Sequence, residues 1–228
     1  IQRILEEADI KPFKIRYYCE KRDPEFERKM HNVLVVYKQV ELQFDEDGNL
    51  IPFSGQPLHT ISYDEKPGIQ VLSTTSDDRR PVKGNGVVQR DYEYVRKGTI
   101  SLLAGIDLLT GEAIPYISDT HKSSDFIGFL KKLDEKYPKG DKIRLILDNH
   151  SAHTSKETRE YLTTMAGRFE FVFTPKHGSW LNLVEGFFSK LTRQMLREIR
   201  VAHKEELIER IYKYFEEIND SPIVYHWK

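Results

Sequence analysis

The stretch that decides the fold is Ile143-Arg144-Leu145-Ile146-Leu147-Asp148-Asn149-His150-Ser151-Ala152-His153. Four of its first five residues are aliphatic, which is typical of a strand buried on both faces of a helix-covered sheet. Asp148 then stands at the carboxyl end of that strand, where open α/β sheets bind their ligands. The following residues, 154–157, have the spacing of a capping box, so we expect a helix to begin at Thr154. Taken alone, Asp148 fits a plain turn between strand and helix equally well.

Length and composition indicate a folded domain with a small appendage. The chain has 228 residues, 39% of them hydrophobic, with 12 Phe and 12 Tyr, which predicts a real core. The single cysteine, Cys19, excludes an internal disulfide framework and fits a reducing compartment. No apolar run is long enough to cross a membrane, and no signal peptide is visible. Because the first residue is Ile1, we expect a fragment whose amino-terminal part is missing.

Charge is balanced overall but unevenly placed. The net charge of −1 argues against indiscriminate nucleic-acid binding, yet it permits a local basic surface. Residues 69–98 are rich in Gly, Arg and Lys and include Arg79 and Arg80. This segment is interpreted as either a solvated loop or a loop that contacts DNA.

The amino-terminal segment is predicted to be helical. The apolar residues of 1–8 have helical spacing, which Lys11-Pro12 ends. A second helix of about five turns begins with Asp23 as its cap and Pro24 at its first position, and it ends at 45–49.

The remainder predicts strands and helices in the order β-β-β-α-β-α-β-α-α. The first strand ends at Asp64 and is followed by a turn at 65–68, and the first helix is capped by Ser123 or Ser124. The other elements are strands at 99–109, 113–118, 143–147 and 169–174, and helices to about residue 137, at 154–166, 179–199 and 203–219. This order is that of a ribonuclease-H-like α/β fold, a mixed sheet of three antiparallel and then two parallel strands flanked by helices.

Three acidic residues occupy the elements whose ends meet in such a fold: Asp64 on the first strand, Asp148 on the fourth, and Glu185 on the helix after the fifth. Crowded carboxylates repel one another, so each raises the pKa of its neighbours unless a cation neutralises them. Carboxylate oxygens without a cysteine partner favour Mg²⁺ or Mn²⁺ over zinc. Two such ions roughly 3.5–4 Å apart can activate water or a 3′ hydroxyl and stabilise the leaving oxygen of a phosphodiester.

A zinc site formed by His150, His153 and His177 is the competing interpretation. An H-x-x-H pair without cysteine, with its third histidine on a separate loop, gives little support to zinc. The alternative roles for these histidines are hydrogen bonds to phosphates or to the catalytic carboxylates, or positioning of the turn.

The predicted helix that carries Glu185 has an apolar arc and a basic face. Lys190, Arg193, Arg197 and Arg200 fall within about 80° of one another, opposite the apolar residues. A solvated basic face is the ordinary explanation, but beside a metal site phosphate binding is the favoured one.

Three blocks of sequence resemble the signature blocks of DDE transposases, within the mariner superfamily and its bacterial insertion-sequence branch. They are Ile61-Ser62-Tyr63-Asp64-Glu65-Lys66, Leu147-Asp148-Asn149-His150-Ser151-Ala152-His153 and Thr174-Pro175-Lys176-His177-Gly178-Ser179-Trp180-Leu181-Asn182-Leu183-Val184-Glu185. The resemblance spans about residues 57–228. Residues 1–52 resemble the end of that family's helix-turn-helix region and its linker helix, so we expect a domain boundary between 52 and 53.

The resemblance implies Asp64, Asp148 and Glu185 as catalytic residues that bind two Mg²⁺ or Mn²⁺ ions. It also implies cleavage of double-stranded DNA at transposon ends, strand transfer into a TA dinucleotide, a homodimer in the DNA complex, and a bacterial cytoplasmic protein that works at the nucleoid. Glu65 is expected either to support the metal site or only to begin a turn. The residues expected to contact DNA are Arg79, Arg80, Asn149, His150, His153, Lys176, His177, Ser179, Asn182, Lys190, Arg193 and Arg197, and Asn149, Lys176, His177, Ser179 and Asn182 are candidates for orienting the carboxylates as well.

Two other functions stay open from the sequence. The first is a domesticated DNA-binding or scaffolding protein that has kept the fold and lost catalysis. The second is a ribonuclease-H-like nuclease for RNA hybrids or branched DNA. A panel of substrates, and melting with and without Mn²⁺, would separate them.

Overall fold

The computed structural model describes residues 2–7, 11–12, 14–15, 23–51 and 55–225. Within the predicted amino-terminal segment, α1 spans Gln2–Glu7. Cys19 and the predicted domain boundary at residues 52–53 lie outside the described residues.

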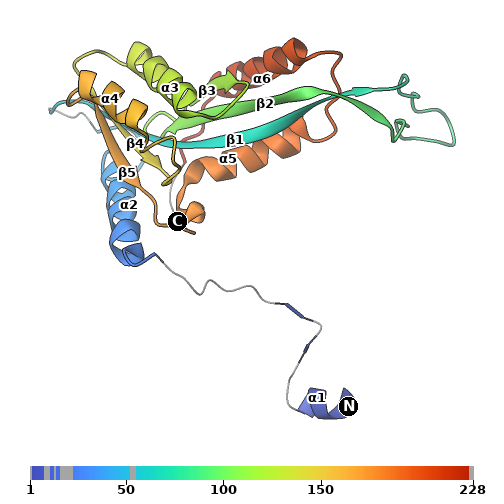
Figure 1. Cartoon of the computed structure of the whole chain (residues 1–228), viewed down its shortest axis with the longest axis horizontal. Helices are drawn as coiled ribbons and strands as arrows, with labels where there is room; N and C mark the ends of the chain where they lie inside the picture. Colours follow the sequence, from blue (N-terminus) through green and yellow to red (C-terminus); the bar gives the residue numbers. More distant parts are fainter. Residues whose placement is uncertain (1, 8–10, 13, 16–22, 52–54, 226–228) are drawn as a thin grey trace.

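A five-stranded mixed sheet in the order β3-β2-β1-β4-β5 forms the centre of the fold (Figure 1). Three strands are antiparallel neighbours: β1 (Leu58–Thr74), β2 (Tyr94–Asp107) and β3 (Ala113–Ser118). Two more, β4 (Lys142–Leu147) and β5 (Phe169–Phe173), continue the sheet parallel to β1. The predicted order of elements and the predicted mixed sheet are therefore confirmed.

Helices cover both faces of this sheet, and Figure 1 shows α3 and α5 on opposite sides of β1 and β2. On one face, α3 (Ser123–Lys136) and α4 (Lys156–Thr164) pack on a cluster rich in aromatic residues. On the other face lie α2 (Phe26–Glu41) and α5 (Leu183–Leu191). The last helix, α6 (Lys204–Asn219), packs against β2 and β3 and shares a core cluster with α5. Among the described helices, none has the length and apolar character that a membrane crossing requires.

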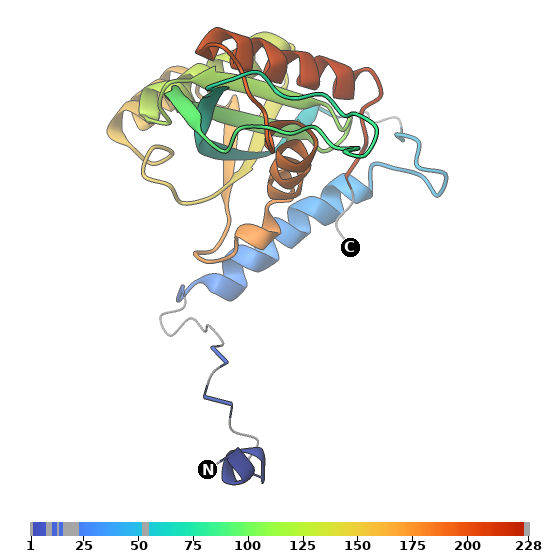
Figure 2. The same ribbon diagram turned by 90° about the vertical axis from the view of Figure 1, so that its right-hand side faces the viewer.

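The helix that the sequence assigned to a linker, α2, packs directly into the core (Figure 2). Its buried face consists of Val33, Val36, Tyr37 and Val40, and it meets Leu108, Ile146 and Leu181. The Tyr37 hydroxyl also donates a hydrogen bond of 2.7 Å to the Leu181 carbonyl. The first helical residue is Phe26, later than predicted, and the Asp23 carboxylate accepts the Glu25 N–H of the preceding turn at 3.0 Å.

The first strand does not end at Asp64 as predicted. β1 continues to Thr74, because Pro67 and Gly68 form a bulge instead of a turn: the pairing with β2 shifts between Lys66 and Ile69, and Gly68 has a φ of +66°. A bulge accommodates both the missing N–H of proline and the left-handed backbone of glycine. Asp64 therefore lies within a strand, paired with Ala104 of β2.

Beyond the helices, β1 and β2 continue as a hairpin arm, residues 72–96, which the sequence predicted as an irregular loop (Figure 1). Leu72 pairs with Arg96 in the β1–β2 ladder. Nearer the tip of the arm, isolated bridges such as Arg79–Gln89 pair the two sides. Long-range pairing with a second strand overrides the polar, glycine-rich composition that favoured a loop.

Two helix starts differ from the predicted capping. The N-cap of α4 is Ser155, not Thr154, and its hydroxyl accepts the Thr158 N–H at 3.1 Å, because the turn after Asp148 extends one residue further. For α3 the N-cap position belongs to Lys122, so neither predicted serine holds it.

The predicted helix at 179–199 is broken into three parts. A 3₁₀ turn, η1 (Ser179–Leu181), precedes α5, and a π-helical turn, η2 (Thr192–Leu196), follows it. The helix ends there because Arg197 is extended and Glu198 has a φ of +68°, which turns the chain toward the Leu72 carbonyl that accepts the Val201 N–H.

Candidate active site

Strand pairing brings Asp64 and Asp148 to neighbouring positions. β1 and β4 pair in parallel and in constant register as far as Ser62 and Ile146. The same register continued by two residues places Asp148 beside Asp64, and adjacent strands lie about 4.8 Å apart. Side chains two positions apart share a face of a sheet, so both carboxylates lie on the face that carries Ser62.

Ser62 docks the start of α5 on that same face. Its hydroxyl donates to Asn182 Oδ1 at 2.5 Å and accepts the Val184 N–H at 3.1 Å. The Asn182 amide also donates to the β1 carbonyl that follows Ser62, at 2.7 Å. Both side chains are almost fully buried, with residue exposures of 0% and 4%. Glu185, in the first turn of α5, is thereby held near enough to Asp64 for its charge to raise the pKa of that residue.

The electrostatics of Asp64 reveal how closely the acidic groups approach. Burial raises the pKa of Asp64 to about 7, and the nearby charges of Glu65, Asp148 and Glu185 add to this effect. A hydrogen bond of 2.8 Å from the Glu65 N–H to Asp64 Oδ1 opposes it only in part. The charges of Asp148 and Glu185 thus act on Asp64, as expected if the three predicted carboxylates lie near one another.

Asp148 has the opposite environment, because His153 supports it. His153 Nδ1 lies 3.0 Å from the Asp148 carbonyl oxygen and 3.2 Å from Asp148 Oδ1, and Nε2 lies 2.8 Å from Glu65 Oε1. Burial alone would lower the pKa of His153, but these contacts outweigh it and raise that pKa to about 9. At neutral pH the ring therefore donates from both nitrogens. Its hydrogen bond is the main cause that lowers the pKa of Asp148.

A cavity of about 290 Å³ opens beside Asp148 and collects several residues that the sequence predicted to contact DNA. Apart from Asp148, its lining consists of Asn149, His150, Thr174, Pro175, Lys176, His177 and Ser179. His177 holds a left-handed φ of +61°, and the Asn149 amide donates to the Thr174 carbonyl at 2.7 Å. The turn residues and the loop after β5 thus form one wall next to Asp148.

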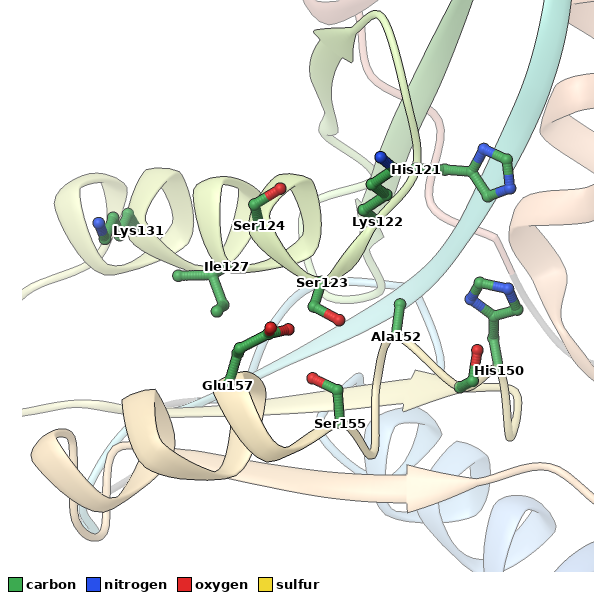
Figure 3. Close-up of a pocket in the computed structure, with 11 residues that line it drawn as sticks. His121, Lys122, Ser123, Ser124, Ile127, Lys131, His150, Ala152, Ser155 and Glu157 are labelled. Atoms are coloured by element: carbon green, nitrogen blue, oxygen red, sulfur yellow. The ribbon is translucent and has the colours of Figure 1, made fainter.

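A larger cavity of about 860 Å³ lies on the other side of the turn, between the first turn of α3 and the start of α4 (Figure 3). His150 lines both cavities, and its ring centroid lies 5.9 Å from that of His121. The sequence interpretation missed His121, because nothing near it in the chain has a catalytic pattern and only the fold brings it here.

Two of the predicted DNA contacts, His153 and Asn182, are wrong. Their residue exposures are 2% and 4%, and the polar atoms of both side chains form hydrogen bonds within the protein. A buried side chain that is already hydrogen-bonded cannot reach a phosphate. Their side chains bond to Asp148 and Glu65 and to Ser62 and Tyr63 instead.

The predicted basic stripe on one helix does not exist. Lys190 lies on α5 and Arg193 in the π-helical turn, whereas Arg197 lies beyond the end of both. Arg79 and Arg80 are exposed on the hairpin arm. The basic candidates thus lie on several elements: the hairpin arm, α5, the π-helical turn and the residues that follow it.

The structure does not assemble the alternative zinc set of His150, His153 and His177 either. Within the described part of the chain, the group of potential ligands is Glu65, His150 and His153, whose ligand atoms lie within 4.8 Å of one another. His177 is replaced by Glu65 in this group, because the bend at His177 belongs to the separate loop after β5.

Comparison with known proteins identifies the family. Residues 64–208, well over half of the chain, match the model of the DDE superfamily endonucleases. The chain belongs to that family. The matched region begins at Asp64 and includes Asp148 and Glu185, so this DDE endonuclease domain contains the whole carboxylate cluster.

Relatives bear out the resemblance to mariner-type and insertion-sequence proteins. An insertion element IS630 protein of 39 kDa, uncharacterized, from Shigella sonnei is 26% identical over 113 residues, covering 50% of this chain and 33% of that protein. The crystal structure of the catalytic domain of Mos1 mariner transposase matches with a TM-score of 0.54 at 13% identity, covering 89% of this chain and 85% of that one. The Mos1 mariner paired end complex with Mn gives a TM-score of 0.56 at 14% identity, covering 94% and 62%. The DDE endonuclease chain thus spans about a third of its curated relative, and the ribonuclease-H-like fold is confirmed.

The donor set of the DDE cluster fits a hard divalent cation. Asp64, Asp148 and Glu185 supply oxygen atoms only, which is the set that Mg²⁺ and Mn²⁺ prefer. Burial is the main cause that raises the pKa of Asp64, and the charges of Glu65, Asp148 and Glu185 add to it. A divalent cation bound there would offset the repulsion between these carboxylates.

Proposed function

We propose that this chain is the catalytic domain of a DNA transposase, which cleaves phosphodiesters at transposon ends and transfers the cut strand into target DNA at a TA dinucleotide. The observation that carries the proposal is the convergence of three carboxylates, through the β1–β4 register and the docking of α5 on Ser62. Family membership supports the endonuclease step. Strand transfer and the TA target rest on the resemblance of the three signature blocks.

In this mechanism Asp64, Asp148 and Glu185 would hold a pair of Mg²⁺ or Mn²⁺ ions. When bound, such ions activate water or a 3′ hydroxyl and stabilise the leaving oxygen of the phosphodiester. Asp148 is kept ionised by His153 and offers a permanent negative charge. Burial and the neighbouring carboxylates raise the pKa of Asp64 to about 7, so a bound cation would favour its ionised form at neutral pH.

The proposed partner is double-stranded DNA. The cavity wall beside Asp148 offers Asn149, His150, Lys176, His177 and Ser179 to the DNA near the cut site. Lys190, Arg193 and Arg197 would bind phosphates next to it, and Arg79 and Arg80 would do so on the arm. We further propose that a homodimer pairs two transposon ends, and that the protein works at the bacterial nucleoid.

We also propose a revised domain division. The packing of α2 against Ile146 and Leu181 supports a catalytic unit that includes residues from Asp23 onward. The segment before it would then belong to the DNA-recognition region expected from the resemblance.

The proposal is tested by incubating the protein with Mg²⁺ and DNA that carries the terminal repeats of its own element, and then mapping the cut sites. Asp148→Asn is expected to reduce cleavage about 100–1,000-fold, roughly the size of the loss when a main electrostatic contributor to the transition state is removed. Circular dichroism should show an intact fold, since Asp148 is exposed.

His31→Gln serves as the matched control, because His31 is exposed on α2 and outside the site. Normal cleavage by Asp148→Asn would refute the proposed mechanism. If the protein binds DNA but does not cleave it, and Mn²⁺ does not shift its melting temperature, the domesticated protein is favoured. A preference for RNA hybrids or branched DNA would favour the nuclease.

A further inference from the structure

We propose that His153 and Glu65 act as a positioning pair that fixes the orientation of Asp148. This inference rests on the proposed function of the carboxylate cluster and adds two residues to it. Neither is assigned contact with DNA or with the reacting atoms.

The pair is held firmly in place. The His153 side chain is fully buried and the Glu65 side chain is 9% exposed. The His153 ring packs 4.5 Å from the Phe126 ring, and the Tyr63 hydroxyl donates to Glu65 Oε1 at 2.8 Å. With every polar atom of the imidazole engaged, the ring has one orientation available.

The pair joins the two strands where their own pairing stops. Among the described residues, backbone pairing between β1 and β4 ends at Ser62 and Ile146, two residues before the aspartates. His153 spans this gap, since Nε2 contacts Glu65, the neighbour of Asp64, and Nδ1 contacts Asp148 at 3.0 and 3.2 Å. The imidazole therefore links β1 to the residues after β4, beyond the last backbone pair of the two strands.

The pair also selects which oxygen of Asp148 remains for a cation. Oδ1 accepts the His150 N–H at 2.8 Å and faces His153 Nδ1. With Oδ1 occupied from two sides, the rotation of the carboxylate is fixed and Oδ2 can face the metal. Outer partners of this kind orient the ligands of a metal site, and their loss costs metal affinity.

The same atoms raise a competing assignment, a metal bound by Glu65, His150 and His153. We assign positioning instead, because Glu65 and His153 already satisfy one another at 2.8 Å. An ion would have to break that contact before it could bind.

The test is a titration of the full chain with Mn²⁺ alone, followed by isothermal calorimetry and by melting. His153→Gln, Glu65→Gln and the double variant are compared, with His31→Gln as the control. Each single variant is expected to raise the half-saturating Mn²⁺ concentration about 10–100-fold. The double variant should be no weaker than the singles, because the two residues act as one unit. The stoichiometry should not change, which separates positioning from ligation.

Asp148→Asn, titrated in parallel, separates failure of this inference from failure of the proposed function. If Asp148→Asn loses Mn²⁺ binding while His153→Gln and Glu65→Gln bind like the unchanged protein, only the positioning role is overturned. If Asp148→Asn binds Mn²⁺ normally, the carboxylate site itself is refuted. If, in addition, His153→Gln loses Mn²⁺ binding, Glu65, His150 and His153 are the metal site. If His153→Gln does not fold, Glu65→Gln alone tests the positioning role, since glutamine keeps the shape of the Glu65 side chain and an oxygen that accepts the Tyr63 hydroxyl.

Discussion

Two aspartates on neighbouring strands meet opposite environments in this site. Burial and three nearby carboxylates resist the charge on Asp64, whereas a hydrogen bond from His153 favours the charge on Asp148. Titratable groups whose pKa values are driven apart mark sites where protons and cations are exchanged. At the residue scale, the ionised form of Asp64 is therefore unfavourable in the folded protein, and a bound metal ion would stabilise it.

This charge predicts that Asp64→Asn stabilises the metal-free protein at alkaline pH. The folded pKa of Asp64, about 7, exceeds its ordinary value of 3.8, so its contribution to stability is present below pH 4 and is lost as pH rises through 7. At pH 8 the variant should gain roughly 2–4 kcal/mol in unfolding free energy, and at pH 4 it should match the unchanged protein. Urea unfolding in chelator at both pH values measures this.

Added Mn²⁺ should reverse the order at pH 8, because only the unchanged protein binds the ion tightly in its native state. An Asp64→Asn variant with the same stability as the unchanged protein across the whole pH range would contradict the crowding of the carboxylates.

At the scale of elements, the helical pattern of the sequence predicted the buried face of α5 correctly. Val184, Phe187, Phe188 and Leu191 are buried, as the spacing indicated. It could not predict where the helix begins and ends, because those points depend on contacts with β1: Asn182 leaves helical geometry to bond Ser62. The position of Glu185 thus depends on one buried hydrogen-bond network.

That network predicts a double effect for Asn182→Ala. Removing the amide takes away the buried acceptor of the Ser62 hydroxyl and the side-chain donor to the Tyr63 carbonyl, so the unfolding free energy should fall by roughly 2–4 kcal/mol. The cleavage rate should also fall, even at temperatures below the unfolding transition, because the start of α5 is no longer fixed against β1. Urea unfolding and cleavage assays at a temperature where both proteins are folded separate the two effects.

Asn32→Ala provides the control for this variant, since Asn32 is an exposed residue of α2 and should change stability by less than about 0.5 kcal/mol. An Asn182→Ala protein that cuts normally would show that Glu185 is positioned by other contacts.

At the scale of the whole molecule, α2 belongs to the fold of the catalytic unit. Four of its side chains are buried against the sheet and the start of α5, and each buried apolar side chain contributes about 1.5–3 kcal/mol. Domains of this kind are stable by only about 5–15 kcal/mol in total. The removal of α2 is therefore expected to exceed what the remaining core can sustain.

Truncation tests this directly. A chain of residues 23–228 should melt cooperatively and bind Mn²⁺ like the full chain, whereas a chain of residues 55–228 should fail to fold or expose its core to a hydrophobic dye. Cooperative melting of the shorter chain near the same temperature would contradict the structural role of α2.

The sequence alone determined the order of strands and helices, the ribonuclease-H-like sheet and the three acidic positions, because hydrophobic period and signature blocks are local properties of the chain. The tertiary structure decided the rest. It turned Pro67-Gly68 into a bulge, buried His153 and Asn182, and divided the basic stripe around Arg197. These outcomes depend on which groups from distant segments find hydrogen-bond partners in the core, and no local pattern records that pairing.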